Sequence, residues 1–270
     1  MEEAKALLDA GNLDGAIQAA LNAVKSKPTD ITARIFLFEL SCFTGDWERA
    51  ERQLDTIGRQ DVNAMVGSLI YRQCIQCERN RAKFFSESLK PVFLSDPPDY
   101  IYGLLQANNR LREGNIAEAR QILDTVEDQR PATSCAVNGE LKEDFRDYND
   151  ATSAILEVFI KDSYCWIPFE QIEKLEIFAP KSLRDLFWLQ GKIETSNGTN
   201  GEIIIPTLYS GSYKHPSDQV RLGRMTDWRD AGEEIFIGEG TKLFWMDGQD
   251  KPILDIQTID FTVESESESE

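Results

Sequence analysis

The sequence predicts an α+β protein of two domains. Residues 1–140 are expected to form an α-helical repeat array, and residues 141–262 a linking helix and a small, mostly antiparallel β domain with one or two helices. A glycine motif recurs in the first half, and short apolar segments rich in β-branched residues follow in the second half. The 270 residues, 41% of them hydrophobic, suffice for a sizeable core.

The motif of the first half reads glycine, asparagine or aspartate, an apolar residue, two variable residues and alanine. It begins at Gly11, Gly45 and Gly114, and its first two copies are 34 residues apart. This spacing resembles the tetratricopeptide signature of two antiparallel helices, in which the glycine marks the turn and the alanine lets the helices approach. The alanines are Ala16, Ala50 and Ala119. The frame predicts a divergent array over Met1–Pro131, with a degenerate unit near Arg79.

Three further segments have apolar residues at helical spacing. Ile31–Phe43 is apolar around most of its circumference, which predicts a helix packed on both sides within the array. Leu141–Ile160 is predicted to be a long helix that leads into the second domain. Phe169–Leu175 follows Pro168, a residue suited to the first turn of a helix, and this stripe predicts another helix before Pro180.

Four later segments are typical of strands, because they are short, apolar and bounded by turn residues. These segments are Ile203–Leu208, Glu234–Ile237, Thr241–Met246 and Ile253–Phe261. Asp247 and Gly248 predict the turn between the last two. Residues 263–270 alternate glutamate and serine after Val263, so we expect this acidic tail to be disordered.

The chain is strongly acidic, with a formal charge of −18 from 29 basic and 47 acidic residues. Phosphate backbones and anionic membrane surfaces repel such a chain, so nucleic acid is not an expected partner. No apolar run approaches the roughly 20 residues of a membrane-spanning helix. The first residues are acidic and short of a signal-peptide core. We expect a cytoplasmic protein without membrane insertion.

The residue types that carry chemistry are scarce and scattered. The five cysteines are an odd number without framework spacing, which predicts reduced thiols. Cys74 and Cys77 form a C-x-x-C pair, but their surroundings are typical of a helix interior, and no second close pair completes a zinc site. His215 is the sole histidine and has no nucleophile-elbow serine near it. We therefore predict no catalytic residues, no cofactor and no metal site.

Gly201–Trp228 has the composition of a specified surface. An apolar run leads into a polar loop that contains Arg221, Arg224, Asp227 and Trp228. A guanidinium group can bind a carboxylate bidentately and tryptophan offers a large apolar face, so this mixture suits recognition of another protein. The alternative is internal: one of the two arginines pairs with Asp227 beneath a capping Trp228.

Four motifs follow one another in the second half of the chain. They are Trp166–Ile172 (WIPFEQI), Pro180–Trp188 (PKSLRDLFW), Pro206–Ser212 (PTLYSGS) and Arg221–Trp228 (RLGRMTDW). Their shared order resembles the ImpE/TagJ (SciE-type) family of accessory proteins of bacterial type VI secretion systems. The resemblance implies a non-enzymatic adaptor that binds the N-terminal helix of the small contractile-sheath subunit. It also implies that the adaptor links the sheath to the AAA+ ATPase that recycles it.

The candidate partner-binding residues lie in these motifs and are Trp166, Phe169, Arg184, Trp188, Tyr209, Arg221, Arg224, Asp227 and Trp228. The alternative function is a general tetratricopeptide co-chaperone that binds peptide tails. Such a protein needs a basic groove, which an acidic chain with a divergent array supports poorly. The sequence specifies neither an oligomeric state nor a direct contact with the ATPase.

Overall fold

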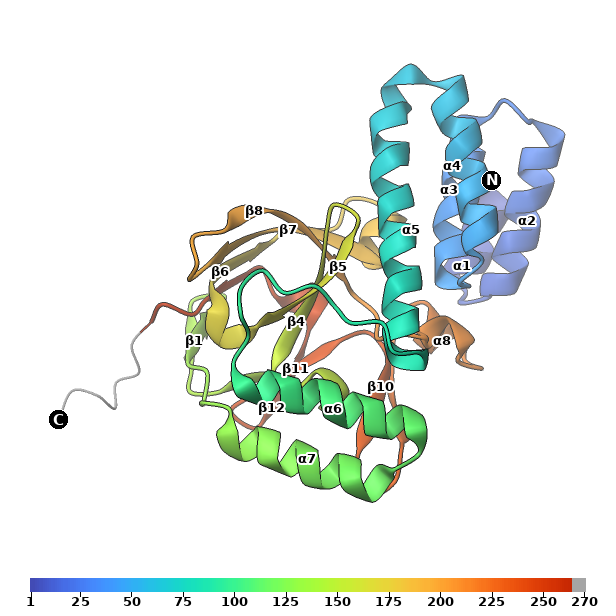
Figure 1. The fold of residues 1–270 in the computed structure, drawn as a ribbon. Coiled ribbons are helices and arrows are strands. Elements are labelled where there is room, and N and C mark those ends of the chain that lie inside the picture. Colours follow the sequence, from blue (N-terminus) through green and yellow to red (C-terminus); the bar gives the residue numbers. More distant parts are fainter. Residues whose placement is uncertain (264–270) are drawn as a thin grey trace.

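Helices make up the first half of the chain and strands most of the second half (Figure 1). The computed structural model describes residues 1–263, so the acidic tail lies outside the described residues apart from Val263. The α-helices are α1 (Glu2–Asp9), α2 (Leu13–Ser26), α3 (Ile31–Phe43), α4 (Trp47–Gln60), α5 (Met65–Ser86), α6 (Asp99–Glu113), α7 (Ile116–Gln129) and α8 (Asp218–Arg221). The β-strands are β1 (Cys135–Val137), β2 (Glu140–Lys142), β3 (Phe145–Asp147), β4 (Ile155–Ile160), β5 (Ser163–Pro168), β6 (Ile172–Ile177), β7 (Trp188–Thr195), β8 (Asn200–Pro206), β9 (Thr226–Asp230), β10 (Phe236–Gly240), β11 (Leu243–Met246), β12 (Gln249–Pro252) and β13 (Thr258–Asp260).

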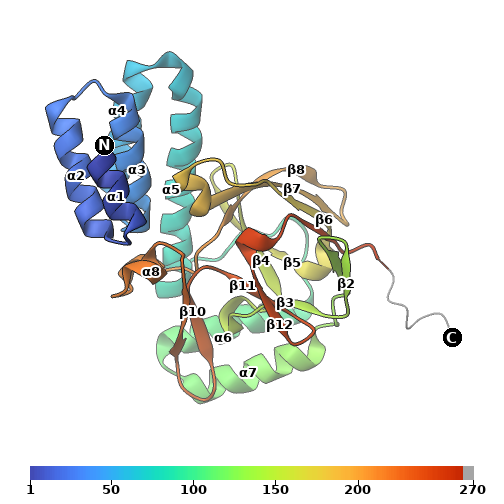
Figure 2. The same ribbon diagram turned by 180° about the vertical axis from the view of Figure 1, so that it is seen from behind.

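Helices α1 to α5 stack side by side as the repeat frame predicts (Figure 2). The turn glycines Gly11 and Gly45 have φ angles of 79° and 64°, in the left-handed region that favours glycine. Asn12 and Asp46, which follow them, cap the next helices by accepting backbone N–H groups. The turns of the first two units are therefore confirmed. The repeat alanines are fully buried where helices meet: Ala16, Ala50 and Ala119.

The pair α6–α7 has the repeat motif but does not join this stack. Its turn glycine, Gly114, is left-handed as predicted, with φ of 77°. The non-helical residues 87–98, which include Pro97 and Pro98, separate the pair from α5. The pair lies against the β region instead (Figure 1), where Asn108 Nδ2 donates to the Ala151 carbonyl at 2.8 Å. The array is thus interrupted after α5, the helix that contains the degenerate unit.

An eight-stranded antiparallel sheet dominates the second half, in the order β2-β1-β13-β6-β7-β8-β4-β5. A second sheet has the order β12-β11-β3, and β9 pairs with β10 in a hairpin. Residues 87–98 cover the edge strand β5, because the Val92 N–H donates to the Tyr164 carbonyl at 2.9 Å and the Trp166 N–H donates to the Val92 carbonyl at 3.0 Å. With the short helix α8, this region agrees with the predicted β domain.

Three of the four predicted strands overlap observed ones. These are Ile203–Leu208 with β8, Glu234–Ile237 with β10, and Thr241–Met246 with β11. The fourth, Ile253–Phe261, contains only β13, because its first residues form a 3-10 turn, Ile253–Asp255. Asp247 and Gly248 do form a turn, with φ of 50° and 79°, but it joins β11 to β12.

The predicted long helix over Leu141–Ile160 is wrong. This segment forms β2, β3 and β4, with a 3-10 turn at Asp150–Thr152 before β4. Strand β4 lies between β5 and β8, and its first five residues are buried whichever face they point to. A strand buried on both faces loses the alternation of apolar and polar residues, so its apolar run also fits a helical stripe.

The predicted helix after Pro168 is also wrong. Pro168 ends the edge strand β5, a position that proline tolerates, and a single 3-10 turn at Phe169–Gln171 leads into β6. The pairing of β6 with β7 shifts between Ile172 and Lys174. Because of this bulge, Ile172 and Leu175 are both buried although they are three positions apart in the sequence. That spacing is typical of a helix.

Two apolar clusters hold the molecule together. One lies within the β region. The other joins the helices to the main sheet: the Phe43 ring of α3 packs edge-on against Phe187 with ring centroids 5.3 Å apart. The Phe84 ring of α5 packs against Trp166 with centroids 4.7 Å apart. The array and the β region therefore share one core along α3 and α5.

Candidate functional site

The loop after β8 packs against the turns of the helical array, and we call residues 210–225 the array clasp. Tyr213 lies against Gly45, and Gln219 lies against Gly11, so closely that a Cβ on either glycine would overlap these side chains. Asp218 Oδ2 accepts the Leu13 N–H at the start of α2 at 3.0 Å. The repeat glycines therefore permit the left-handed turns and also make room for the clasp.

Arg224 binds the end of α1. Its Nη2 donates to the Leu8 carbonyl at 2.8 Å, and its Nη1 faces the Asp9 carbonyl at 3.2 Å. The last carbonyls of a helix have no partner within the helix and carry partial negative charge. A guanidinium group supplies both the hydrogen-bond donors and the opposite charge. Arg224 thus connects the clasp to the array.

Arg221 forms ion pairs on the same side of the clasp. Its Nη1 lies 2.8 Å from Asp218 Oδ1, and its Nη2 lies 3.4 Å from Asp14 Oδ1 of α2. Neither Arg221 nor Arg224 pairs with Asp227 within the described residues. The internal alternative therefore named the wrong carboxylate, because the partners of both arginines lie in α1, α2 and the clasp itself.

Asp227 and Trp228 lie on β9, apart from the two arginines. Asp227 is exposed, and its Oδ2 is 3.3 Å from Nε2 of His215. The half-buried Trp228 ring packs edge-on against Tyr148 at a centroid distance of 5.1 Å, and lies 5.9 Å from the Tyr209 ring. The predicted cluster is therefore split: Arg221 and Arg224 lie in the array clasp, whereas Asp227 and Trp228 lie in the β9–β10 hairpin.

Four of the candidate partner-binding side chains are core residues. They are Trp166, Phe169, Trp188 and Tyr209, and each is 3% exposed or less. The Trp188 indole donates to Glu78 Oε1 at 3.1 Å. The Tyr209 hydroxyl donates to Asp147 Oδ1 at 2.8 Å. These side chains present no surface to a partner, because the motifs that contain them hold the sheet against the helices.

Arg184 also makes internal contacts, although part of its side chain is exposed. It lies in a 3-10 turn before β7, Leu183–Leu186. Its Nε donates to the Tyr71 hydroxyl at 2.8 Å, and its Nη1 donates to Glu39 Oε1 at 2.9 Å. Burial raises the pKa of Glu39, and the charge of Arg184 partly offsets this rise. Arg184 thus ties the β region to α3 and α5.

Four charged side chains form what we call the buried charge cluster: Arg81, Asp147, Glu157 and Lys242. Each is 2% exposed or less. Arg81 clamps Glu157 with two hydrogen bonds of 2.8 Å, from Nε and from Nη2. The Lys242 ammonium contacts Glu157 and lies 3.7 Å from Asp147 Oδ2. The cluster joins α5 to β3, to β4 and to the start of β11.

Two cations in the cluster face two carboxylates, and a third buried carboxylate, Glu78, lies 3.4 Å from Arg81 Nη1 with its pKa raised by burial. Burial alone would raise the pKa of Glu157, but the charges of Arg81 and Lys242 hold it well below the usual range. Burial raises the pKa of Asp147, and Lys242 partly offsets this effect. Arg81 and Glu157 are 76 positions apart, so no local spacing links them. The one sequence signal is Glu157 itself, a charge within the apolar run Ile155–Ile160.

The thiols lie in environments that disfavour reactivity. All five cysteines are buried free thiols. Burial raises the pKa of Cys77 to about 12 and that of Cys165 to about 11, so both are protonated at neutral pH. Over residues 1–263, no group of three histidine, cysteine or acidic side chains is placed to hold a metal ion.

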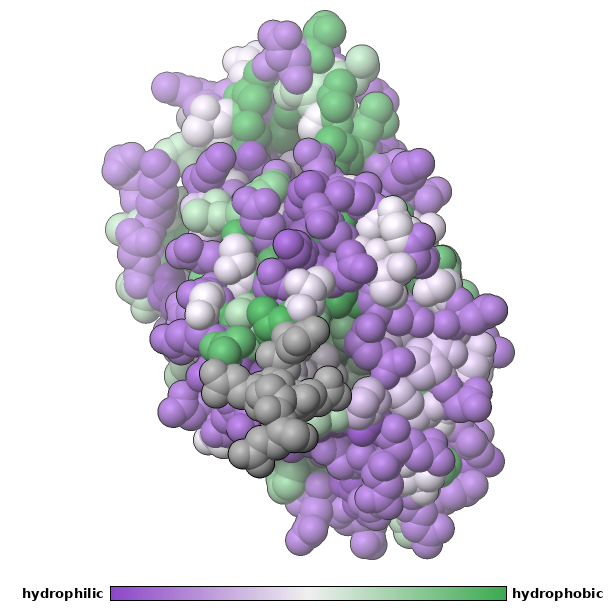
Figure 3. Space-filling model, turned by 90° about the vertical axis from the view of Figure 1, so that its left-hand side faces the viewer, coloured by the Kyte–Doolittle hydropathy of each residue, from purple (hydrophilic) through white to green (hydrophobic). Residues whose placement is uncertain are grey.

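An apolar strip is exposed at the start of α5 and in the 3-10 turn before it, Val62–Ala64. We call it the α5 strip, and it consists of Val62, Met65, Val66, Leu69 and Ile70. These side chains are 44% to 79% exposed. Figure 3 shows hydrophobic residues gathered at this end of the molecule. Beside Ile70, a groove of ≈ 250 Å³ extends between α5 and strands β7 and β8, and Phe178 lines it.

The sequence analysis missed the α5 strip. Val62, Val66, Leu69 and Ile70 have the spacing of one helical face, which was a usable signal. Cys74, four residues after Ile70, continues this face but is buried, and Ile75 is buried on another side of α5, so apolar residues occupy more than one side of the helix. None of the described helices is both long and apolar enough to cross a membrane.

Comparisons with known proteins agree with this architecture. The family model for the ImpE protein matches residues 139–260, and that for the tetratricopeptide repeat matches residues 7–70. The type VI secretion system accessory component TagJ from Pseudomonas aeruginosa is 34% identical over 258 residues, which cover 96% of this chain and 90% of that protein. A protein from Vibrio parahaemolyticus with a known crystal structure is 25% identical, with a TM-score of 0.88 over 97% of this chain and 98% of that one. Since the identity to TagJ extends over nearly the whole of both chains, the chain belongs to the ImpE/TagJ family.

Proposed function

We propose that this protein is a non-enzymatic, cytoplasmic accessory component of a type VI secretion system. In this proposal it binds the N-terminal helix of the small contractile-sheath subunit at the α5 strip. Membership of the ImpE/TagJ family supports the accessory role, because the Pseudomonas aeruginosa relative is described in those words. The exposed α5 strip is the observation that supports this position for the binding site.

The strip has the chemistry of a helix-docking surface. Its residues recur at the spacing of one helical face over the first turns of α5, where the helix extends past the β region (Figure 1). Soluble proteins rarely leave a contiguous row of large apolar side chains in water, so such a row marks an interaction surface. The apolar face of an amphipathic helix buries it by matching ridges to grooves. The groove next to Ile70 supplies the second wall.

The same surface argues against the co-chaperone alternative. Recognition of an acidic peptide tail needs several converging cations, whereas the α5 strip is apolar. Arg72, which lies next to it on α5, is already paired with Asp55 of α4. An apolar helix face is the better ligand for this strip.

The non-enzymatic part of the proposal agrees with the buried, protonated thiols and with the description of the relative as an accessory component. We also propose, from the family resemblance, that the protein links the sheath to its AAA+ ATPase. Pull-down of the purified ATPase with the immobilised sheath subunit, with and without this protein, tests that link. Retention only in the presence of all three components supports a bridge, and no retention in either case contradicts it.

Calorimetric titration with a peptide of the sheath subunit's N-terminal helix tests the binding site. Leu69→Asp should weaken binding by about 2 kcal/mol or more, as an anchor in the centre of an interface does. Leu141→Asp is the matched control, because Leu141 is a similarly exposed leucine, 58% against 56% for Leu69, on strand β2. Equal affinities for wild type and Leu69→Asp, or an equal loss in both variants, would place the site elsewhere.

A further inference from the structure

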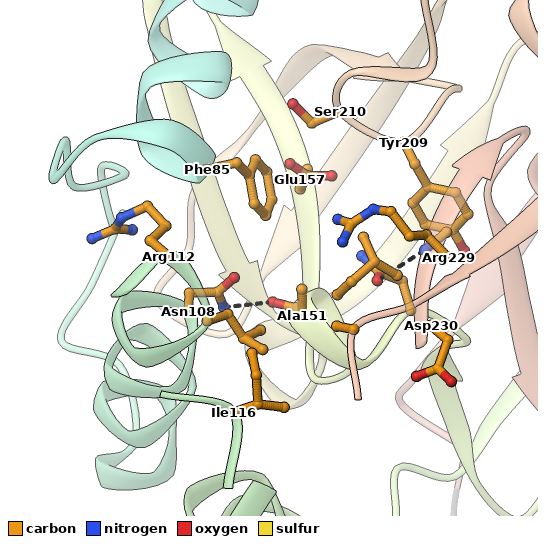
Figure 4. A pocket seen from close by; sticks show the side chains of 15 residues that line it. Phe85, Asn108, Arg112, Ile116, Ala151, Glu157, Tyr209, Ser210, Arg229 and Asp230 are labelled. Atoms are coloured by element: carbon orange, nitrogen blue, oxygen red, sulfur yellow. Dashed lines mark hydrogen bonds between the residues drawn. The ribbon is translucent and has the colours of Figure 1, made fainter. Parts of the chain in front are cut away.

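A pocket of ≈ 330 Å³ opens between the helix pair α6–α7 and the hairpin β9–β10 (Figure 4), and no residue of the α5 strip lines it. One part of its wall is apolar. The apolar side chains come from α5, α6, α7 and β10, and they are Phe85, Leu111, Ile116 and Ile237. This part of the wall suits a branched aliphatic side chain.

Asn108 of α6 presents an acceptor to this pocket. Its Nδ2 donates to the Leu104 carbonyl at 2.9 Å and to the Ala151 carbonyl at 2.8 Å. Because two carbonyls hold the amide nitrogen, the orientation of the amide group is fixed, and Oδ1 is the atom that faces the pocket (Figure 4). Asn108 is only 3% exposed, and its Oδ1 accepts no hydrogen bond from the side chains or backbone of residues 1–263. Because Oδ1 is open to the pocket and receives no donor from the described residues, a ligand N–H can donate to it.

Arg229 of β9 presents a cation to the same space. Its guanidinium group extends toward the centre of the pocket, whereas that of Arg112 points away (Figure 4). Among the described carboxylates, the one in ion-pair range is Glu239, at 3.7 Å from Nε. A guanidinium group with free donors is a carboxylate-binding group.

Two carboxylates also line the pocket, but neither opposes an anionic ligand strongly. Glu157 is neutralised from behind by Arg81 and Lys242 of the buried charge cluster. Asp230 is turned away from Arg229 (Figure 4), and its Oδ1 accepts the Gly232 N–H at 2.7 Å. The cation that points into the pocket is Arg229, whose Nη donors remain open to a ligand while Glu239 lies 3.7 Å from its Nε.

We propose that this pocket binds the free C-terminus of a peptide whose last residue is aliphatic. The terminal carboxylate pairs with Arg229, a backbone N–H donates to Asn108 Oδ1, and the last side chain packs against the apolar wall. One residue at the end of a chain carries all three groups within a few bonds of one another. The site is separate from the α5 strip, since none of its lining residues belongs to that strip.

Calorimetric titration with the peptide acetyl-Gly-Ala-Leu tests the proposal. The free acid should bind at least tenfold more tightly than the C-terminal amide, because only the acid can pair with the guanidinium group. Arg229→Gln should weaken binding of the acid at least tenfold and leave binding of the amide unchanged. Arg59→Gln is the matched control, since it removes the same charge from an exposed position on α4. Ile116→Trp, which fills the apolar wall, should abolish binding of both peptides.

Circular dichroism and melting temperature show whether each variant is folded before it is titrated. Equal binding of acid and amide, an unchanged affinity in Arg229→Gln, or no binding of the acid up to about 5 mM would each overturn the proposal. Acetyl-leucine carries the same three groups and separates the two sources of this chemistry. Binding of acetyl-leucine at least tenfold tighter than that of the tripeptide would show that the pocket does not admit the preceding residues. That result would assign the pocket to a small N-acyl amino acid and overturn the assignment to a chain terminus.

Discussion

Replacing Arg81 by methionine would remove the cation that clamps Glu157 in the buried charge cluster. Methionine keeps much of the aliphatic volume of arginine but has no donors. The change leaves Glu157 with Lys242 as its sole cation within the cluster. It also removes the donor to the Leu208 carbonyl, which Arg81 Nη2 contacts at 2.8 Å.

The expected loss of stability follows from these contacts. Without Arg81, Lys242 is the one cation of the cluster that faces Asp147 and Glu157, and Glu78 loses its cation as well, so the buried charge becomes more negative. Breaking a buried ion pair from one side costs about 3–5 kcal/mol, because the other charge is left uncompensated. An unpaired carbonyl adds about 1–3 kcal/mol, and uptake of a proton by Glu157 or Glu78 offsets part of the total. We expect Arg81→Met to lose about 3–5 kcal/mol, a large part of the stability of a typical domain.

Urea denaturation followed by tryptophan fluorescence measures this loss, since Trp166 and Trp188 are both buried in the same core. The double variant Arg81→Met, Glu157→Leu removes one charge of each sign from the cluster, so its loss should be smaller than the sum of the single losses by about 0.5–3 kcal/mol. The exposed Arg59→Met is the control. A loss below about 1 kcal/mol in Arg81→Met, or single losses that simply add, would refute the electrostatic argument.

Ala50→Trp should lower the free energy of unfolding by about 1–3 kcal/mol, because Ala50 is fully buried between helices; an unchanged urea midpoint would contradict the repeat frame. Arg224→Ala should lower the free energy of unfolding by about 1.5–3 kcal/mol, because the charged hydrogen bonds to the end of α1 are lost. Titration should find its affinity for the sheath peptide unaltered. A variant of unchanged stability with weakened binding would instead assign Arg224 to the interface. Burial would raise the pKa of Asp144, but hydrogen bonds from Arg130 hold this pKa below its usual value. The ionised Asp144 therefore stabilises the fold at pH values above the unfolded pKa of about 3.9, and this stabilisation is lost as the pH falls through the folded pKa. Asp144→Asn should therefore be less stable than wild type at pH 7, with a difference that shrinks as the pH falls below about 4 in parallel denaturation curves; a difference that is constant with pH would exclude the ionised carboxylate as its cause.

The parts of the fold that the sequence predicts correctly depend on local signals. Gly11, Gly45 and Gly114 each mark a left-handed turn because the requirement for glycine lies within a few residues. The β region was harder, since tertiary context sets its pattern. Burial on both faces removed the alternation in β4, and the bulge at Ile172 gave β6 the spacing of a helix.

The candidate site shows the same division between local and distant information. The motifs around Trp166 and Trp188 were recognisable in the sequence, but whether an aromatic side chain is buried depends on elements far away in the chain. Trp188 is covered by α3, α4 and α5, which precede it by more than one hundred residues. For the α5 strip, the spacing of residues 62–70 indicates an apolar helix face, but it does not indicate whether another element covers that face.

The array clasp has a consequence for synthesis of the protein. The Leu13 N–H is bonded to Asp218, 205 positions later in the chain. A ribosome adds roughly 5–20 residues per second, so helices α1 and α2 leave it roughly 10–40 s before the clasp exists. During that interval the turn at Gly11 lacks its cover, and until residue 187 is made Phe43 of α3 lacks the Phe187 ring that packs against it. A nascent chain stalled before residue 210 would therefore carry finished helices with uncovered inner faces, the kind of surface that chaperones bind.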